Sequence, residues 1–180
     1  MGTGEEGVYR NAFFGFSLNF PKDWSVLSRE QTEKSLQIGQ DILKSQDKKN
    51  SAVIEAAAQR ELLILVLAEK ADAAGKAANL VVSVRKQSSA VTAEMVVEAT
   101  KSLFLQNSSI KLLKDTQKIK LGGETFLSIE LQNSLHGEFI HQRLFTFMRK
   151  GYSLTFVVTY KKSESLRAME NVLQSLSFTN

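Results

Sequence analysis

YRNAFFGFSLNFPKDWSV, residues 9–26, carries the most specific structural pattern in this chain. Apolar and polar residues alternate over residues 16–20, which is the two-residue period of a strand with one buried face. Pro21, the only proline of the sequence, ends this strand because it has no N–H to donate to a sheet. Trp24 follows as a large apolar anchor. We therefore expect a β-hairpin over residues 9–20 that packs against the core.

The aromatic residues of this stretch are candidates either for the core or for a ligand cage. They are Phe13, Phe14, Phe16, Phe20 and Trp24. Large aromatic side chains gain much free energy from burial, so we expect them in the core. Phe13 or Phe14 is the exception we expect, exposed at the tip of the hairpin.

Two motifs resemble the PsbP-like family. From Tyr9 to Trp24 the chain reads Tyr-x-Asn and then Gly-Phe-Ser-Leu-x-Phe-Pro-x-x-Trp, which resembles the opening of that family. The stretch GKAANLVVSV, from Gly75 to Val84, resembles its Gly-x-x-x-Asn-x-x-Val region. The family includes photosystem PsbP, a Ran-binding import factor, DcrB-type envelope proteins and bacterial lipoproteins. The resemblance implies an α-β-α sandwich, accessory or assembly roles, and no shared active site that could be carried over.

Length and composition indicate one globular domain. The chain has 180 residues, 43% of them hydrophobic and 23% charged, which are ordinary values for a folded protein. The absence of cysteine excludes disulfides, thiolate metal ligands and thiol nucleophiles. We expect a disordered head at residues 1–7, a single domain at residues 8–180, and a polar helical insertion at residues 29–60. The longest apolar run, residues 62–68, is too short to span a bilayer.

The remaining sequence predicts alternating strands and helices. Ser28-Arg-Glu-Gln31 is a capping box that opens a helix to about Lys49, and residues 51–61 predict a further helical segment. Glycine pairs or single glycines separate the strands of a four-strand meander. Beyond the insertion we expect strands at residues 62–69 and 79–87 joined by a loop at 70–78, a helix at 92–107, strands at 110–121, 124–135, 138–150 and 152–160, and a helix at 163–176.

Both of these later helices have an apolar side. We expect Ser163 to be the N-cap of the second. The apolar positions are Met95, Val96, Ala99 and Leu103 in the first helix, and Leu166, Met169, Leu173 and Leu176 in the second. Because the central strands are apolar on both sides, helices must cover both faces of a largely antiparallel sheet. The pattern thus predicts an α+β fold, a three-layer α-β-α sandwich, in agreement with the resemblance.

The net charge of +4 comes from one segment. Residues 101–120 hold Lys101, Lys111, Lys114, Lys118 and Lys120 against the single acidic residue Asp115, and the remaining charges cancel. Strand periodicity predicts Lys114, Lys118 and Lys120 on one face and Lys111 on the other. One interpretation is a contact site for a protein partner or an anionic membrane surface. The other is that the lysines protect an edge strand from aggregation. No arginine or aromatic residue stands between Lys111 and Lys120, which argues against nucleic acid.

The two histidines are the only candidates for a metal site. His136, Glu138 and His141 could supply two nitrogens and a carboxylate to zinc. In an extended strand, however, His136 and Glu138 share a face while His141 points to the other, so surface histidines are the simpler interpretation. The sequence also has no Gly-x-Ser-x-Gly elbow and no phosphate-binding loop. We therefore expect no cofactor and no enzymatic activity.

The start of the sequence leaves two interpretations of localisation open. Residues 1–7 contain no apolar segment of a signal peptide, and Glu6 stands where N-myristoylation requires Ser or Thr. The chain is then either cytoplasmic or a mature segment separated from its signal and anchoring cysteine. The resemblance favours the second interpretation, a periplasmic, secreted or lipid-anchored protein.

We expect a non-catalytic extracytoplasmic domain that binds a macromolecule in an accessory or assembly role. One alternative is a chaperone-like binder of apolar helices, which requires an exposed concave apolar sheet face. The other is a small-molecule carrier or enzyme, which requires a buried pocket lined with convergent polar groups.

Overall fold

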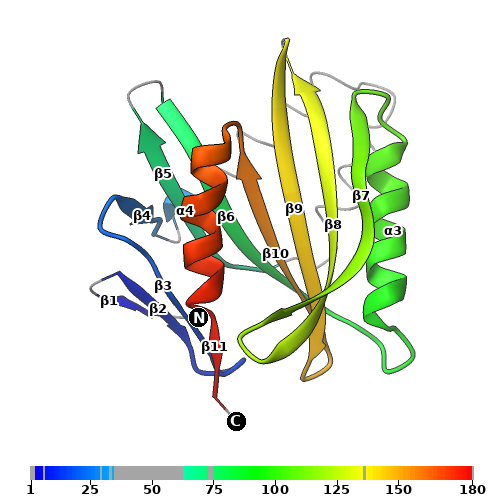
Figure 1. The fold of residues 1–180 in the computed structure, drawn as a ribbon. Coiled ribbons are helices and arrows are strands. Elements are labelled where there is room, and N and C mark those ends of the chain that lie inside the picture. Colours follow the sequence, from blue (N-terminus) through cyan, green and yellow to red (C-terminus); the bar gives the residue numbers. More distant parts are fainter. Residues whose placement is uncertain are drawn as a thin grey trace.

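The computed structural model describes residues 3–5, 7–28, 30–32, 34, 63–72, 75–135 and 137–179 of the chain. Its elements are shown in Figure 1. In chain order they are β1 (Thr3–Glu5), β2 (Val8–Asn11), β3 (Phe16–Asn19), β4 (Trp24–Val26), β5 (Leu63–Asp72), β6 (Gly75–Lys86), α3 (Ala93–Leu105), β7 (Ile110–Leu121), β8 (Glu124–Leu135), β9 (Glu138–Arg149), β10 (Tyr152–Tyr160), α4 (Ser163–Gln174) and β11 (Ser177–Phe178).

The strands form two sheets in which every neighbouring pair is antiparallel. The larger sheet has seven strands in the order β4-β5-β6-β10-β9-β8-β7, and the smaller has four in the order β1-β2-β3-β11. The small sheet joins the two ends of the chain, because β11 near the C-terminus pairs with β3. The predicted hairpin over residues 9–20 is thus confirmed as β2 and β3, which a C-terminal strand extends into a sheet.

The seven-stranded sheet is covered on both faces, as the sequence predicted. Helix α4 and the small sheet lie over one face, while α3 lies against the opposite face of β7, β8 and β9 (Figure 1). Each face has its own hydrophobic core. The chain therefore has the predicted α+β architecture, a three-layer α-β-α sandwich with an antiparallel sheet. No helix of the described segments is long and apolar enough to cross a membrane.

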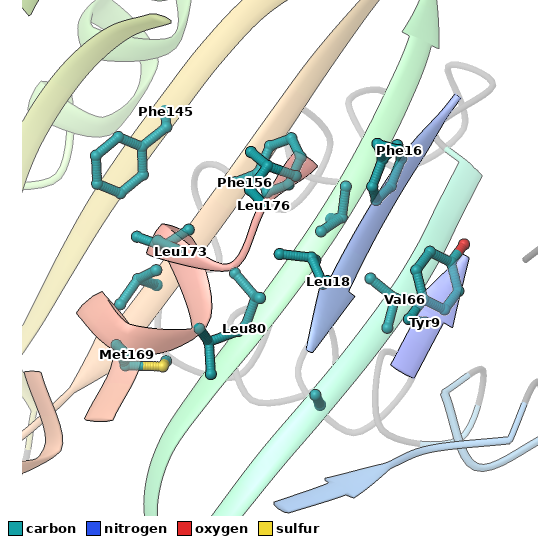
Figure 2. Packing of buried hydrophobic residues seen from close by; sticks show 14 of the residues in the cluster. Tyr9, Phe16, Leu18, Val66, Leu80, Phe145, Phe156, Met169, Leu173 and Leu176 are labelled. Atoms are coloured by element: carbon teal, nitrogen blue, oxygen red, sulfur yellow. The ribbon is translucent and has the colours of Figure 1, made fainter. Parts of the chain in front are cut away.

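The larger core lies between the sheet and the layer formed by α4 and the hairpin. Figure 2 shows Met169 and Leu173 of α4 and Phe16 and Leu18 of the hairpin pointing toward the strands, with Leu80 among them. Buried hydrophobic side chains of this kind contribute roughly 1.5–3 kcal/mol each relative to exposed ones. The alternation of residues 16–20 is therefore explained by one face of β3 packing on the large sheet.

The meander of four strands is confirmed with its turns at the predicted glycines. The connections contain Gly122, Gly123, Gly137 and Gly151, and each of these has a positive φ. Left-handed backbone is strained for residues with a Cβ, so glycine permits the tight reversals. Gly122 has a second role, because a Cβ there would lie 2.8 Å from the carbonyl oxygen of Leu176. It lets the C-terminal segment approach the β7–β8 turn.

The start of the polar insertion has the capping box that the sequence predicted. The backbone N–H of Ser28 donates to Oε1 of Gln31 at 2.9 Å, and the N–H of Gln31 donates to Oγ of Ser28 at 3.3 Å. These reciprocal bonds are the predicted capping box. Helical backbone follows at residues 30–32 and 34. The predicted extension of this helix to Lys49 and the segment at 51–61 lie outside the described residues.

Two predictions about strands and termini are wrong. Within the expected loop at 70–78, residues 70–72 and 75–78 belong to paired strands, in which Lys70 pairs with Ala78 and Asp72 with Gly75. The Ala- and Lys-rich composition of this segment is typical of loops, but pairing between neighbouring strands stabilises extended backbone. Within the head that was expected to be disordered, β1 pairs with β2. Gly7 makes this reversal possible with a φ of 78°, and its carbonyl accepts from the N–H of Phe20 at 2.6 Å.

Two details of the helices also differ from expectation. The N-cap of α4 is Lys162, without a side-chain capping bond, so Ser163 is the first helical residue instead of the cap. In α3, Val97 is buried against the sheet, whereas Met95 and Leu103 of the predicted apolar side are exposed. The helix carries two overlapping apolar stripes, and its periodicity alone does not say which one faces the sheet.

Candidate interaction site

Strand β7, which carries the lysine cluster, is an edge strand of the seven-stranded sheet. It pairs with β8 and is the last strand in the sheet order (Figure 1). The side chains of Lys111, Lys114, Lys118 and Lys120 are all exposed. We call these four residues the lysine edge. Docking and protection from aggregation both require exposed lysines on an edge strand, and β7 meets this requirement.

The predicted distribution of the lysines over the two faces of β7 is wrong. Register shifts between Leu112 and Lys114, and again between Lys114 and Gln117, break the two-residue alternation. Lys111 and Lys114 stand opposite Gln132 and Glu130, on the face covered by α4. The other two lysines stand opposite Leu127 and Thr125, on the face covered by α3. The lysine edge therefore presents cations on both sides of the sheet.

Helix α3 neutralises part of the charge next to β7. Lys101 Nζ lies 2.7 Å from Glu98 Oε1 and 2.8 Å from Asp115 Oδ1. The hydrogen bond with Asp115, followed by the one with Glu98, raises the pKa of Lys101. At the start of α3, a hydrogen bond from its own backbone N–H lowers the pKa of Glu94, with smaller effects from Thr92 and from the charge of Lys118. Lys101 is thus a structural ion-pair residue that ties α3 to β7.

On the α4 face, Lys114 belongs to a partly buried polar cluster. Glu130 Oε2 lies 2.9 Å from Lys114 Nζ and 3.8 Å from Arg143 Nε. The Tyr160 hydroxyl donates to Glu130 Oε1 at 3.2 Å. Arg143 Nη1 also lies 3.5 Å from Oε1 of Glu170 on α4. We call these five residues the Glu130 cluster. Its charged groups are compensated inside the chain, so it fixes Lys114 in place.

The Glu130 cluster shifts the pKa values of Glu130 and Tyr160 in opposite directions. Burial alone would raise the pKa of Glu130, but Lys114, Tyr160 and Arg143 together hold it below its ordinary value. Burial, followed by the negative charge of Glu130, raises the pKa of Tyr160 to about 12. At neutral pH the carboxylate is therefore charged and the phenol is neutral, which suits a donor–acceptor pair with a structural role.

Of the residues suggested for a metal site, Glu138 and His141 lie on opposite faces of β9 and do not come together. Glu138 forms an ion pair with Lys161. His141 stacks on the ring of Tyr160, with the ring centroids 5.3 Å apart, on the opposite face of β9. His136 lies outside the described residues. Among the described residues, no group of three histidine or acidic side chains is placed to hold a metal ion.

The aromatic residues of the hairpin are mostly in the core, as expected. Phe14, Phe16, Phe20 and Trp24 are buried, whereas 57% of Phe13 is exposed at the hairpin tip. The other exposed large hydrophobic residues of the described segments come from α3, β7 and β9: they are Met95, Leu103, Leu105, Leu113 and Phe139. Three of these five side chains belong to a helix, so within the described segments only Leu113 and Phe139 are exposed large hydrophobic residues on strands.

This chain is similar to known proteins in its structure. No protein-family model matches the chain, and no curated protein matches its sequence. The solution structure of cyanobacterial PsbP (CyanoP) from Synechocystis matches 98% of this chain and 95% of its own length, with 11% identity and a TM-score of 0.58. The chain has a PsbP-like fold.

Other proteins share this PsbP-like fold. LpqN, involved in cell envelope biogenesis of Mycobacterium tuberculosis, matches 92% of this chain and 83% of its own, with 12% identity and a TM-score of 0.55. The T6SS immunity protein TplEi of Pseudomonas aeruginosa, complexed with "L" peptide, matches 97% of this chain and 99% of its own, with 11% identity and a TM-score of 0.52. The chain spans 46% of the length of a matching protein from Bacteroides thetaiotaomicron.

Sequence reasoning missed most of the Glu130 cluster within the PsbP-like fold. Its members come from β7, β8, β9, β10 and α4, and only Lys114 was singled out in advance. A signal existed, because Glu130 stands between the apolar residues Ile129 and Leu131, and Arg143 directly precedes Leu144 and Phe145. Buried charges are rare unless they are paired, so two such residues of opposite sign on neighbouring strands are candidates for a pair.

Proposed function

We propose that this chain is a non-catalytic, extracytoplasmic accessory module that binds an acidic protein surface through Lys111, Lys118 and Lys120 of the lysine edge. The observation that carries the proposal is the state of three lysines on β7. Within the described part of the chain, Lys111, Lys118 and Lys120 form no ion pair within 4.0 Å. By contrast, Lys101 and Lys114 are neutralised by neighbouring carboxylates. The net positive charge of the segment is thus available to a partner.

The arrangement of the lysines favours a protein over a membrane. Lysines on both faces of the sheet flank the strand edge from two sides, which suits a partner that encloses the edge more than a flat anionic surface. A protein with an acidic groove or an acidic extended segment can contact both sides of a strand edge. Proteins of the same fold support a binding role, since TplEi was determined in complex with a peptide. LpqN, with its role in cell envelope biogenesis, supports the extracytoplasmic assignment.

The competing explanation is that the lysines keep β7 from pairing with other chains. This protection needs few charges, because one or two lysines on an edge strand discourage pairing. Protection of the edge also requires no binding partner. The two explanations therefore differ in whether reversal of the lysine charges removes a specific complex.

The test compares two triple variants with equal changes in net charge. The edge variant carries Lys111→Glu, Lys118→Glu and Lys120→Glu, and it leaves the Lys114–Glu130 contact intact. The control variant carries Lys22→Glu, Lys34→Glu and Lys86→Glu, at exposed positions away from β7. Each immobilised protein is exposed to solubilised extract of the source cells, and to vesicles with and without anionic lipid, at low and high salt. Melting temperatures establish that both variants are folded.

The proposal predicts a stoichiometric protein partner that binds the wild type and the control variant but not the edge variant. High salt should weaken this complex because exposed charges are screened. Equal capture by the two variants would overturn the docking site. Binding to anionic vesicles alone, lost in the edge variant, would replace the protein partner with a membrane surface.

A further inference from the structure

The second half of β7 is a regular, open strand edge. From Gln117 to Leu121 its register with β8 is unbroken, and no other described strand pairs with its outer side. An open edge of this kind presents backbone N–H and C=O groups that another extended chain can pair with. The first half differs, because the register shifts around Lys114 interrupt the ladder.

Both ends of this regular edge are fixed by the chain itself. On the N-terminal side, Asp115 is tied to Lys101 of α3, and its carboxylate also accepts from the N–H of Thr116 at 2.7 Å. On the C-terminal side the strand ends at the Gly122–Gly123 turn. Pairing is therefore confined to residues 117–121, a window of five residues opposite Glu124–Ser128.

The side chains along this window alternate in chemistry. Lys118 and Lys120 are exposed and stand on the α3 face. Ile119 and Leu121 are half-buried on the other face, where they pack against the larger core. A strand that paired with this edge would place its own side chains beside these residues, alternately on the two faces. Opposite charges next to the lysines and apolar groups next to Ile119 and Leu121 are the stabilising choice.

We infer that the partner contributes an extended segment of alternating acidic and apolar residues, which adds to residues 117–121 as a further strand of the seven-stranded sheet. This inference rests on the proposed function and specifies how the lysine edge binds. Main-chain hydrogen bonds would supply affinity, while the alternating side chains would supply specificity. Lys118 and Lys120 then have two roles, because they repel other basic edges and select an acidic strand.

The probe is a synthetic peptide with a core of alternating Glu and Val, compared with a peptide of the same composition in which Glu and Val form blocks. Two further peptides keep the alternating sequence but carry N-methyl groups on either the odd or the even residues. Alternate N–H groups of a strand point to opposite edges, so only one of these peptides can still pair with β7. Binding is followed by amide chemical shifts at millimolar peptide and by hydrogen exchange of residues 117–121.

The inference predicts that the alternating peptide and one of the N-methylated peptides protect those amides of residues 117–121 whose N–H groups point away from β8. Three combinations should bind at least about tenfold more weakly, because hydrogen bonds to the ladder or charge pairs are lost. They are the other N-methylated peptide, the peptide in which Glu and Val form blocks, and the alternating peptide with a Lys118→Glu/Lys120→Glu variant. Equal binding of both N-methylated peptides, or no protection by the parent peptide, would overturn strand addition. Those results would leave the proposed docking site to be judged by capture with the edge and control variants.

Discussion

Replacement of Glu130 by Gln tests whether the Glu130 cluster stabilises the fold. The substitution keeps the shape of the side chain and removes its charge, which leaves Arg143 with Glu170 as its remaining counter-ion. Loss of one partner from a buried ion pair costs about 3–5 kcal/mol, whereas exposed pairs contribute about 0–1 kcal/mol. The Glu130 side chain is 11% exposed and that of Lys114 is 56% exposed, so the cluster lies between these limits.

We therefore expect Glu130→Gln to lower the free energy of unfolding by about 2–3 kcal/mol at neutral pH. For a domain of this size, that corresponds to a fall in melting temperature of roughly 5–10 °C. Urea denaturation measured in parallel on wild type and variant gives the difference directly. The matched control is Glu138→Gln, which removes the same charge from an exposed pair with Lys161 and should cost less than about 1 kcal/mol.

The effect of Glu130→Gln should also depend on pH. The folded pKa of Glu130 is lower than its unfolded value, so its contribution is complete above the unfolded pKa, about 4.3. The contribution is then lost as the pH falls through the folded pKa. The stability difference between wild type and variant should accordingly shrink below about pH 4. A neutral-pH cost under about 0.5 kcal/mol, or a difference that does not shrink in acid, would refute the structural role of the cluster.

Three further predictions concern stability. The wild type should lose stability as the pH rises from 10 through about 12, because the raised pKa of Tyr160 favours the folded state only while the phenol is protonated. Tyr160→Phe should not show this loss. Identical pH profiles of the two proteins in urea denaturation would mean that the pKa of Tyr160 is ordinary. Gly15→Ala should cost about 2–4 kcal/mol, since its φ is 64° and a Cβ would lie 2.7 Å from the Thr179 carbonyl oxygen. The control Gly151→Ala, with no atom within 4 Å, should cost about 1–2 kcal/mol, and equal losses would contradict the clash. Trp24→Ala should cost about 3–5 kcal/mol on denaturation, and a loss under about 1 kcal/mol would place Trp24 outside the core.

The meander and the hairpin could be predicted because their signals are local. In β10, apolar residues such as Leu154 and Phe156 recur with the strand period, and glycine stands at each reversal. The loop prediction at 70–78 failed because Ala and Lys have weak strand preference, while the pairing of β5 with β6 depends on residues elsewhere in the sheet. Tertiary contacts overrode composition at this point.

The candidate site was harder to predict because the register of β7 with β8 decides which face of the sheet each lysine occupies. Lys114 and Lys118 are an even number of residues apart, and an unbroken strand would place them on one face. The register shifts around Lys114 arise from pairing with β8, and no residue between Lys114 and Lys118 indicates a β-bulge in the sequence. The Glu130 cluster depends in the same way on partners from five elements. The sequence did indicate the segment that carries the charge, since composition alone locates it.

The most direct test of the docking claim is the amount of partner bound per mole of edge variant, relative to the control variant, at physiological salt. The two proteins carry the same number of Lys→Glu substitutions, so net charge does not distinguish them. If Lys111, Lys118 and Lys120 form the docking site, the control variant retains a stoichiometric partner and the edge variant loses it. Equal amounts of partner on the two variants would contradict the account and leave the lysines with the protection of an edge strand as their role.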